Sequence, residues 1–415
     1  MTTRWASVSH ASSYASYADF LHLCDAGRVI ERVRKALSGK TEPMLALIER
    51  LVAVNSFTDS PAGGNEVGEM LAAELRGIEG MSARVIPSQR YAAHWIAESD
   101  AARATPAGCV AIVGHLDTVF PPGSFEGFRR DGDLARGPGV LDMKGGLVMA
   151  IEALRALAEV GALARIPVRL AIVYDEEVGS PEGAAILRRE LHGAACALVL
   201  EAGRKGDAVI TARKGTGSVR ASATGKAAHA GNAHHEGVNA IWALARFIDR
   251  AQRVTDYERG VTVNVGKVSG GQSKNTVPDQ AEAALDFRFV RSPDGDAALE
   301  ALRAAAREAA AEVPGAAIEL HGALARPPLE RTEANLALYR EYAAHARAAG
   351  LGDAESPLVG GGSDASTTAA IGIPSIDGLG PRGAGFHTKD ERIEVASLVP
   401  KAEALAALLL GRARG

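Results

Sequence analysis

Three apolar, strand-like stretches of the sequence run directly into side chains that could bind metal or move protons. The first is Val168–Tyr174, which is followed by three acids in a row, Asp175, Glu176 and Glu177. Adjacent carboxylates repel one another, and no lysine or arginine lies beside these three. The balancing positive charge must therefore come from elsewhere in the fold, and a bound metal ion is one source of it.

The second stretch, "VGHLDTV", ends in His115 and Asp117. Residues two apart on a strand face the same side, so Asp117 can accept a hydrogen bond from the second nitrogen of the His115 imidazole. Histidines that bind metals usually have such a partner, which fixes the orientation of the ring. A histidine and an aspartate paired only for structural reasons would give the same pattern.

Other candidate residues follow glycine-rich or strand-like segments: Asp142 in "GPGVLDMKGG", Glu201 at the end of "LVLEAG", and His387 in "GAGFHTKDE". A carboxylate such as Asp142 often only caps the helix that follows it. The glycines also permit the close backbone approach that a crowded site requires. Gly137 and Gly139 suggest a dinucleotide loop, but the third glycine is out of place and no strand ends directly before them.

These residues have a common position, because functional groups of open α/β sheets collect at the carboxyl ends of the strands. Each one alone could be a solvated loop acid or a surface histidine. Two histidines and several carboxylates at one sheet edge together indicate a metal site. Imidazole mixed with carboxylate favours zinc, and manganese or cobalt is also compatible. No C-x-x-C or H-E-x-x-H motif is present, so the site must be rich in carboxylates.

The elements that must position these residues alternate between helices and strands. The first clear helix starts at Thr41, which we expect to act as its cap, with Pro43 near the first turn. The alternation predicts an α/β domain of three layers with a mostly parallel central sheet. The expected helices are 41–54, 64–76, 145–159 and 181–189, and the expected strands are 110–114, 168–174 and 197–200.

Near Arg213 the pattern changes to alternating, exposed strands. It predicts a smaller α+β unit of two layers, with strands at 217–226, 261–268, 281–290 and 316–321 and helices at 237–254 and 296–312. The α/β pattern resumes after Pro327. We therefore predict a first domain at 41–212 and 326–415 and an inserted lid or dimerisation domain at 213–325. Residues 1–40 are expected to be a loosely ordered extension.

Composition excludes several classes of protein. The chain has 415 residues, a net charge of -4 and three cysteines. We expect no nucleic-acid partner, because there is no basic stripe with aromatic residues. An odd number of widely spaced cysteines indicates a reducing compartment, and we expect a cytoplasmic protein. We expect no membrane association, because no run is apolar enough to span a bilayer and the N-terminus lacks the apolar middle of a signal peptide.

The order of these motifs resembles a known superfamily. The co-catalytic di-zinc amidohydrolases have a similar series of motifs: H-x-D, G-x-x-D-x-K-G-G, E-E, E and a late His. This superfamily includes glutamate carboxypeptidase, aminoacylase, acetylornithine deacetylase and succinyl-diaminopimelate desuccinylase. The resemblance extends from Thr41 to the C-terminus and includes the inserted domain. "GHLDTVFPPGSF" and "GPGVLDMKGG" look most like the glutamate carboxypeptidase branch.

The resemblance implies a complete metal centre with two Zn²⁺ ions, for which Co²⁺ or Mn²⁺ are possible substitutes. It implies His115 and Glu201 as ligands of one ion, Glu177 and His387 as ligands of the other, and Asp142 as the bridge between them. It also implies that Asp117 is the acid that orients His115. Glu176 would be the general base. In this superfamily the peptide bond after the bridging acid, here Asp142–Met143, is often cis.

Five further positions match residues that contact substrate or the transition state in the family. His229 matches a histidine that stabilises the oxyanion, often in the active site of the dimer partner. Asn275 and Arg288 match substrate-binding residues, and Arg288 would hold a terminal carboxylate. Gly360 and Gly361 lie in "VGGGSDAS", which resembles a loop that holds substrate carboxylate through backbone N–H groups. A strand-end histidine at 229, and an ion pair of Arg288 with Asp286 or Glu282, are the structural alternatives.

The expected function is therefore metal-dependent hydrolysis of an amide bond in a small peptide or N-acyl amino acid with a free carboxylate. The expectation includes both a carboxypeptidase and an N-deacylase, because Ala208 stands at the place of the lysine that selects glutamate in the best-known family members. An inactive binding protein of the same fold is a remote alternative. "GGSDA" fails the serine-hydrolase motif G-x-S-x-G at Ala365, and "SGKT" fails the P-loop motif at Arg34.

Overall fold

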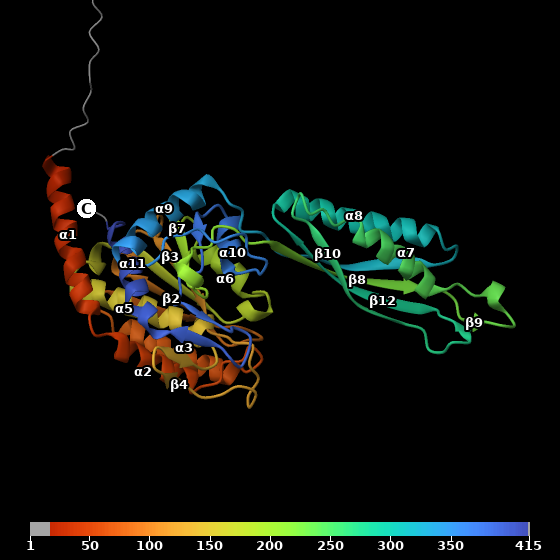
Figure 1. Cartoon of the computed structure of the whole chain (residues 1–415), viewed down its shortest axis with the longest axis horizontal. Helices are drawn as coiled ribbons and strands as arrows, with labels where there is room; N and C mark the ends of the chain where they lie inside the picture. The colour runs from red at the N-terminus through yellow and green to blue at the C-terminus, as the bar shows by residue number, and fades with distance from the viewer. Residues whose placement is uncertain (1–16, 414–415) are drawn as a thin grey trace, which may run out of the picture.

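The computed structural model describes residues 17–413, with side chains from Gly27 onward. Figure 1 shows two units, a rounded main domain that includes both ends of the described chain and an elongated inserted domain that extends away from it. The chain enters the inserted domain just after Arg213 and returns at Arg326, the last residue of its last strand. We keep the predicted boundaries, 213 and 325, as our proposed division of the chain.

The main domain is built on a six-stranded sheet of order β1-β2-β6-β3-β7-β14. Strands β6, β3, β7 and β14 are parallel, whereas β1 and β2 form an antiparallel edge, so the sheet is mostly parallel as predicted. The central strands β3, β6 and β7 are buried along their whole length because both faces of a parallel sheet are covered. Their bounds are β1 Met81–Ile86, β2 His94–Ser99, β3 Val110–His115, β6 Val168–Val173, β7 Cys196–Val199 and β14 Ser375–Ile376.

Helices pack on both faces of this sheet and make the expected three layers. Along β3, Val110 and Ile112 belong to one apolar cluster, whereas Ala111 and Val113 belong to another. The first cluster involves α1 Tyr17–Leu37, α2 Thr41–Val52, α3 Pro61–Arg76, α5 Gly145–Glu159, α9 Glu333–Ala348 and α11 Leu398–Leu410. The second involves α4 Asp100–Ala104, α6 Gly183–Glu190 and α10 Asp364–Ala370.

A second, smaller sheet of the main domain joins segments that flank the site. Its order is β15-β16-β5-β4, with β4 Arg129–Asp131, β5 Leu134–Arg136, β15 Gly383–Ala384 and β16 Arg392–Glu394. Strand β5 leads directly into the glycine-rich turn, and β15 and β16 enclose the segment that carries His387. Two motifs that are about 250 residues apart in sequence therefore lie on neighbouring strands.

The inserted domain is an antiparallel sheet of order β10-β12-β8-β13 with two helices on one face. Buried and exposed residues alternate along β12, as expected for a sheet with one solvated face. Phe247, Phe287 and Phe289 lie in the core between the sheet and the helices. The bounds are β8 Gly215–Thr224, α7 Ala240–Gln252, β10 Thr262–Gly270, β12 Gln280–Phe289, α8 Ser292–Ala311 and β13 Ala317–Arg326.

The prediction of a loosely ordered N-terminal extension is wrong for its second half. Residues 17–37 form helix α1, and the last part of this helix packs against the main domain. Val33 and Leu37 are fully buried, and Arg34 Nε donates a hydrogen bond to Glu403 Oε1 of α11 at 2.6 Å. The apolar positions Val29, Val33 and Leu37 recur with helical spacing, and this signal could have been recognised. Residues 1–16 lie outside the described chain.

Among the described residues, no helix has both the length and the apolar composition needed to cross a membrane.

Candidate metal centre

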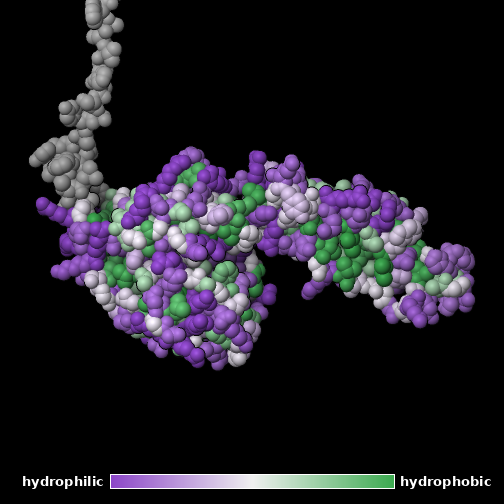
Figure 2. All heavy atoms as spheres, viewed as in Figure 1, coloured by the Kyte–Doolittle hydropathy of each residue, from purple (hydrophilic) through white to green (hydrophobic). Residues whose placement is uncertain are grey.

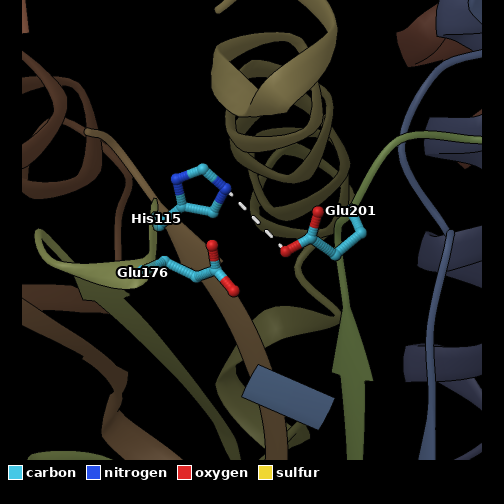
Figure 3. Close-up of side chains that lie close together, drawn as sticks. All are labelled: His115, Glu176 and Glu201. Carbon is cyan, nitrogen blue, oxygen red and sulfur yellow. Dashed lines mark ion pairs between the residues drawn. The ribbon is translucent and has the colours of Figure 1, made fainter. Parts of the chain in front are cut away.

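The carboxyl ends of the central strands bring the predicted residues together. His115 is the last residue of β3, Glu201 follows β7 by two positions, and Glu176 lies in the short 3-10 helix Glu176–Val178 after β6. Figure 3 shows the side chains of His115, Glu176 and Glu201 pointing toward one another. His115 Nε2 lies 3.8 Å from Glu201 Oε1. The spatial cluster predicted from strand ends is thus present.

Asp142 lies between the two histidines. Its Oδ1 is 3.2 Å from His115 Nε2, and its Oδ2 is 3.3 Å from His387 Nε2. Each carboxylate oxygen therefore faces a different imidazole, which is the arrangement that a carboxylate bridging two cations needs. The Asp142–Met143 peptide bond is cis, as the resemblance implied.

The second half of the centre is formed by Glu177 and His387. Glu177 Oε2 lies 3.0 Å from His387 Nε2. The side chain of His387 is 49% exposed, whereas that of Glu177 is 6% exposed. His387 also has a left-handed backbone, with φ of 62°. It is held by a loop at the surface, unlike the other candidate ligands, which lie deep at the sheet edge.

Asp117 is placed to orient the centre. Its Oδ1 lies 3.3 Å from His115 Nδ1, so the imidazole turns its other nitrogen toward Asp142. Asp117 also accepts hydrogen bonds from Thr58 Oγ1 at 2.8 Å and from the backbone N–H groups of Glu176 and Glu177. One fully buried carboxylate thereby connects the histidine to the two glutamates, and Thr58 is a contributor that the sequence did not reveal.

The surroundings of the site raise the pKa values of several of its carboxylates and of His387. Burial raises the pKa of Glu176 to about 8, although the neighbouring Arg326 opposes the shift. Burial, with the charges of Asp142 and Glu176, raises the pKa of Glu201 well above its usual value. Contacts with Asp142 and Glu177 raise the pKa of His387 to about 10. These shifts show that the site favours positive charge, which bound metal ions can supply.

The donor set fits metal. The ligand atoms of His115, Asp142 and Glu177 lie within 4.8 Å of one another, and so do those of His115, Glu176 and Glu201. Two imidazoles with several carboxylates and no thiol suit zinc, cobalt or manganese. The second group includes Glu176, for which the resemblance implies a role as base, so geometry alone leaves Glu176 open as a ligand.

Arg326 is the main residue of the site that the sequence reading missed. Its Nη2 lies 2.9 Å from Glu176 Oε1 and donates a hydrogen bond to the Glu176 carbonyl oxygen at 2.6 Å. Its Nη1 donates to Asp364 Oδ1 at 3.2 Å. The sequence contained a signal, because an arginine next to "PP" at the end of the insert falls where the chain returns to the main domain.

Asp175 has a structural role in the turn that follows β6. Its Oδ2 accepts a hydrogen bond from Glu182 N at 2.6 Å, and both of its oxygens accept from Gly183 N. A Cβ atom at Gly183 would lie only 2.4 Å from Asp175 Oδ1, so this turn requires glycine. The three adjacent acids therefore differ in their surroundings: Asp175 closes the turn, Glu176 faces Arg326, and Glu177 faces His387.

The predicted substrate-contacting residues lie apart from the metal ligands in this chain. His229, in β9 Ala228–His229, and Asn275 are exposed. In Figure 1, β9 lies at the end of the inserted domain that is far from the main domain. Arg288 forms the ion pair with Asp286 named above as its structural alternative, at 2.7 and 2.9 Å. Within one chain, His229 is therefore remote from the metal centre.

The glycine loop lies beside the inserted domain. Arg288 Nη1 donates to the Gly360 carbonyl oxygen at 3.4 Å, and Arg213 Nη1 donates to that of Gly361 at 3.1 Å. Both glycines are exposed. These contacts use their carbonyl groups, and the predicted contact of their N–H groups with a substrate carboxylate remains a prediction.

Sequence comparison finds a family match and full-length relatives. Residues 111–411 match the model of peptidase family M20/M25/M40. Carboxypeptidase G2 of Pseudomonas sp. strain RS-16 is 28% identical over 382 residues, which cover 91% of this chain and 90% of the relative. Succinyl-diaminopimelate desuccinylase of Gluconacetobacter diazotrophicus is 28% identical over 399 residues, which cover 90% of this chain and 98% of the relative.

Solved structures share the architecture. Aminopeptidase PepT from Bacillus cereus aligns with a TM-score of 0.75 and 25% identity, covering 90% of this chain and 99% of that structure. The metallo-carboxypeptidase Sso-CP2 of Sulfolobus solfataricus aligns with a TM-score of 0.69 and 19% identity, covering 88% and 98% of the two chains. The second likeness concerns the fold alone.

Proposed function

The chain belongs to peptidase family M20/M25/M40, and from this premise we propose that it is a metal-dependent hydrolase that cleaves an amide bond next to a free carboxylate, in the manner of a carboxypeptidase. The observation that carries the proposal is the position of Asp142, whose two carboxylate oxygens face His115 and His387 separately. Two zinc ions, or cobalt or manganese in their place, are the cofactors that we propose for this donor set.

The proposed ligand set follows the contacts. His115 and Glu201 would hold one ion, Glu177 and His387 the other, and Asp142 both. When bound, the ions supply Lewis-acid chemistry, which polarises the scissile carbonyl and makes water easier to ionise. The protein's part is to keep these donors fixed, and Asp117 does so for His115 by occupying its Nδ1 side.

Glu176 is our candidate for the general base. Its carboxylate would take a proton from the attacking water and return it to the nitrogen of the leaving amine. A pKa of about 8 in the buried site suits a group that must both accept and give a proton near neutral pH. Arg326 holds this carboxylate at 2.9 Å and restricts its movement toward the metal ligands.

The second candidate function is hydrolysis of an N-acyl amino acid. It is favoured by the relative named as a desuccinylase, which this chain matches over 98% of that protein's length. The carboxypeptidase remains our first proposal because the carboxypeptidase G2 match has comparable coverage and agrees with the motif resemblance. Both reactions break an amide bond and need the same metal centre.

We further propose a homodimer formed through the inserted domain, with His229 of the partner subunit donating a hydrogen bond to the oxyanion. Strand β10 is at the edge of its sheet, and exposed edge strands favour pairing with another chain. Ile241, Trp242 and Val268 are large exposed hydrophobic residues of this domain, on which Figure 2 shows a broad hydrophobic area. We also propose a cytoplasmic location.

The decisive test uses the whole protein. It is stripped with chelator, its metal content is checked by elemental analysis, and it is reloaded with Zn²⁺, Co²⁺ or Mn²⁺. Each form is screened against dipeptides with C-terminal Glu, Asp or neutral residues and against N-acetyl and N-succinyl amino acids. We expect activity only in reloaded protein and on dipeptides. Full activity after verified removal of metal would contradict the proposal, and activity confined to N-acyl substrates would favour the deacylase.

A further inference from the structure

The turn that carries Asp142 is held by a carboxylate with no role so far, Glu391. Its side chain is fully buried, and Glu391 is the residue directly before β16, Arg392–Glu394. Glu391 Oε1 accepts hydrogen bonds from Leu141 N at 2.8 Å and from Asp142 N at 3.0 Å. Its Oε2 accepts from Gly139 N at 3.0 Å.

These contacts give hydrogen-bond partners to backbone N–H groups of a turn whose own backbone is irregular. Gly139 has a left-handed φ of 76°, and Asp142 and Met143 have non-helical backbone angles. The N–H groups of such a turn point to one side and form a concave anion site, which here is filled by a side chain of the protein. A buried polar backbone group without a partner is costly, so this carboxylate determines the conformation of the turn.

The same residue belongs to the loop that carries His387. Glu391 N donates to Thr388 O at 3.1 Å, and Thr388 N donates to Gly385 O at 3.0 Å. The Glu391 carbonyl accepts from Gly137 N at 3.4 Å. His387 is the most exposed of the candidate ligands, so its position depends on this loop more than on core packing.

We infer that Glu391 is a positioning residue that fixes Asp142 relative to His387, and that it thereby sets the affinity for the metal ion held by Glu177, His387 and Asp142. The inference rests on the proposed metal centre. It concerns mainly one half of that centre. Asp142 would contact both ions, but the other ligands of the first ion, His115 and Glu201, lie at the ends of the central strands β3 and β7, away from the loop. Loss of the Glu391 contacts should therefore lower the affinities for the two ions by unequal factors.

The test compares Glu391→Gln with wild type and with Asp390→Asn. Gln keeps the size of the side chain, but it loses the charge and one acceptor. Asp390→Asn removes the same charge from the preceding residue of the loop, whose side chain is 79% exposed and pairs with Arg136 instead of with the Asp142 turn. Stripped proteins are titrated with Co²⁺ and followed by its visible absorption, and zinc content is measured after dialysis against buffers of fixed free zinc.

We expect wild type and Asp390→Asn to bind two ions. Glu391→Gln should bind the second ion about 10–100-fold more weakly, the usual range for residues that support metal ligands, and the first ion should lose clearly less affinity. Activity should return at high metal concentration, because Glu391 does not touch the reacting atoms. Thermal unfolding of the stripped proteins shows whether Glu391→Gln is folded.

Two outcomes would overturn the inference: wild-type affinity for both ions in Glu391→Gln, or equal weakening of both ions in a folded variant. If Glu391→Gln does not fold, Thr388→Val replaces it. That change at an exposed residue removes the bonds of Thr388 Oγ1 to Gly385 O and Asp390 N, and it should weaken the second ion selectively. An unchanged affinity of Thr388→Val for the second ion would then overturn the inference. Absence of metal from wild type would instead contradict the proposed function.

Discussion

Glu176 and Glu177 are adjacent, but they contact groups of different kinds. Glu177 faces the imidazole of His387 at 3.0 Å, whereas Glu176 faces the guanidinium of Arg326 at 2.9 Å. A carboxylate that is bound to metal is a poor base, so the residue beside Arg326 is the better candidate for proton transfer.

Glu176→Gln should therefore keep both metal ions and lose turnover. We expect kcat to fall by about 10²–10⁴-fold, the usual contribution of a general base. The measurement is kcat together with zinc content by elemental analysis. The matched control is Glu177→Gln, which should lose one ion. Loss of metal from Glu176→Gln would mean that Glu176 is a ligand, as its grouping with His115 and Glu201 allows.

Arg326 should tune the protonation of Glu176. Burial raises the pKa of Glu176, and the positive charge of Arg326 lowers it again. Removal of that charge in Arg326→Met should raise the pKa further, so a higher pH is needed before the base is ionised. The acidic limb of the kcat/KM profile should therefore move to higher pH. Arg326→Lys, which keeps a positive charge, should show a smaller shift, and an unmoved limb in Arg326→Met would contradict this assignment.

At the scale of elements, helix α11 carries a lysine into the core. Lys401 is fully buried, its Nζ has no hydrogen bond to the described residues, and the nearest carboxylate oxygen, Asp207 Oδ1, is 3.6 Å away. Burial lowers the pKa of Lys401 to about 8 from 10.5. Between these two values the unfolded chain binds a proton that the folded chain lacks, so the contribution of Lys401 to stability rises with pH across this window.

Lys401→Met should remove this dependence. The free energy of unfolding of the variant should exceed that of wild type by the largest amount below pH 8, because there wild type must keep a charge in its core. The difference in free energy of unfolding should shrink by on the order of 3 kcal/mol as pH rises to 10.5. Urea unfolding at several pH values measures it. Lys205→Met, at an exposed lysine of the neighbouring loop, should leave the pH dependence unchanged.

Elements with strong periodicity were predictable, and the supporting contacts were not. The apolar runs of β3, β6 and β7 and the helix α5 lie within two residues of their expected bounds, because burial on both faces dictates their composition. The five candidate ligands were recognisable as strand ends and glycine-rich motifs. The partners Thr58, Arg326 and Glu391 were not, because each acts through a contact between segments that are distant in sequence.

At the scale of the molecule, the position of His229 is the strongest argument for a second chain. It lies at the end of the inserted domain that is far from the metal centre of its own chain (Figure 1). Buried arginines also hold the two chain connections between the domains. Arg213 bonds to Asp377 at 2.6 Å, and Arg326 bonds to Asp364 at 3.2 Å. These contacts hold the inserted domain away from the main domain, and they support our proposal that His229 acts at the metal centre of a partner subunit.

If so, two inactive variants should complement each other. In a mixed dimer of Glu176→Gln and His229→Ala chains, the His229→Ala chain keeps Glu176 and receives an intact His229 from its partner. One site of each mixed dimer should then work, so random pairing should restore about a quarter of wild-type activity. The measurement is activity of a mixture co-expressed with two different tags. As a control, Glu176→Gln with Asp142→Asn should restore nothing, because both defects lie in the same half of the site. No recovery in the first mixture, with mixed dimers demonstrated by sequential affinity purification, would show that His229 does not act across subunits.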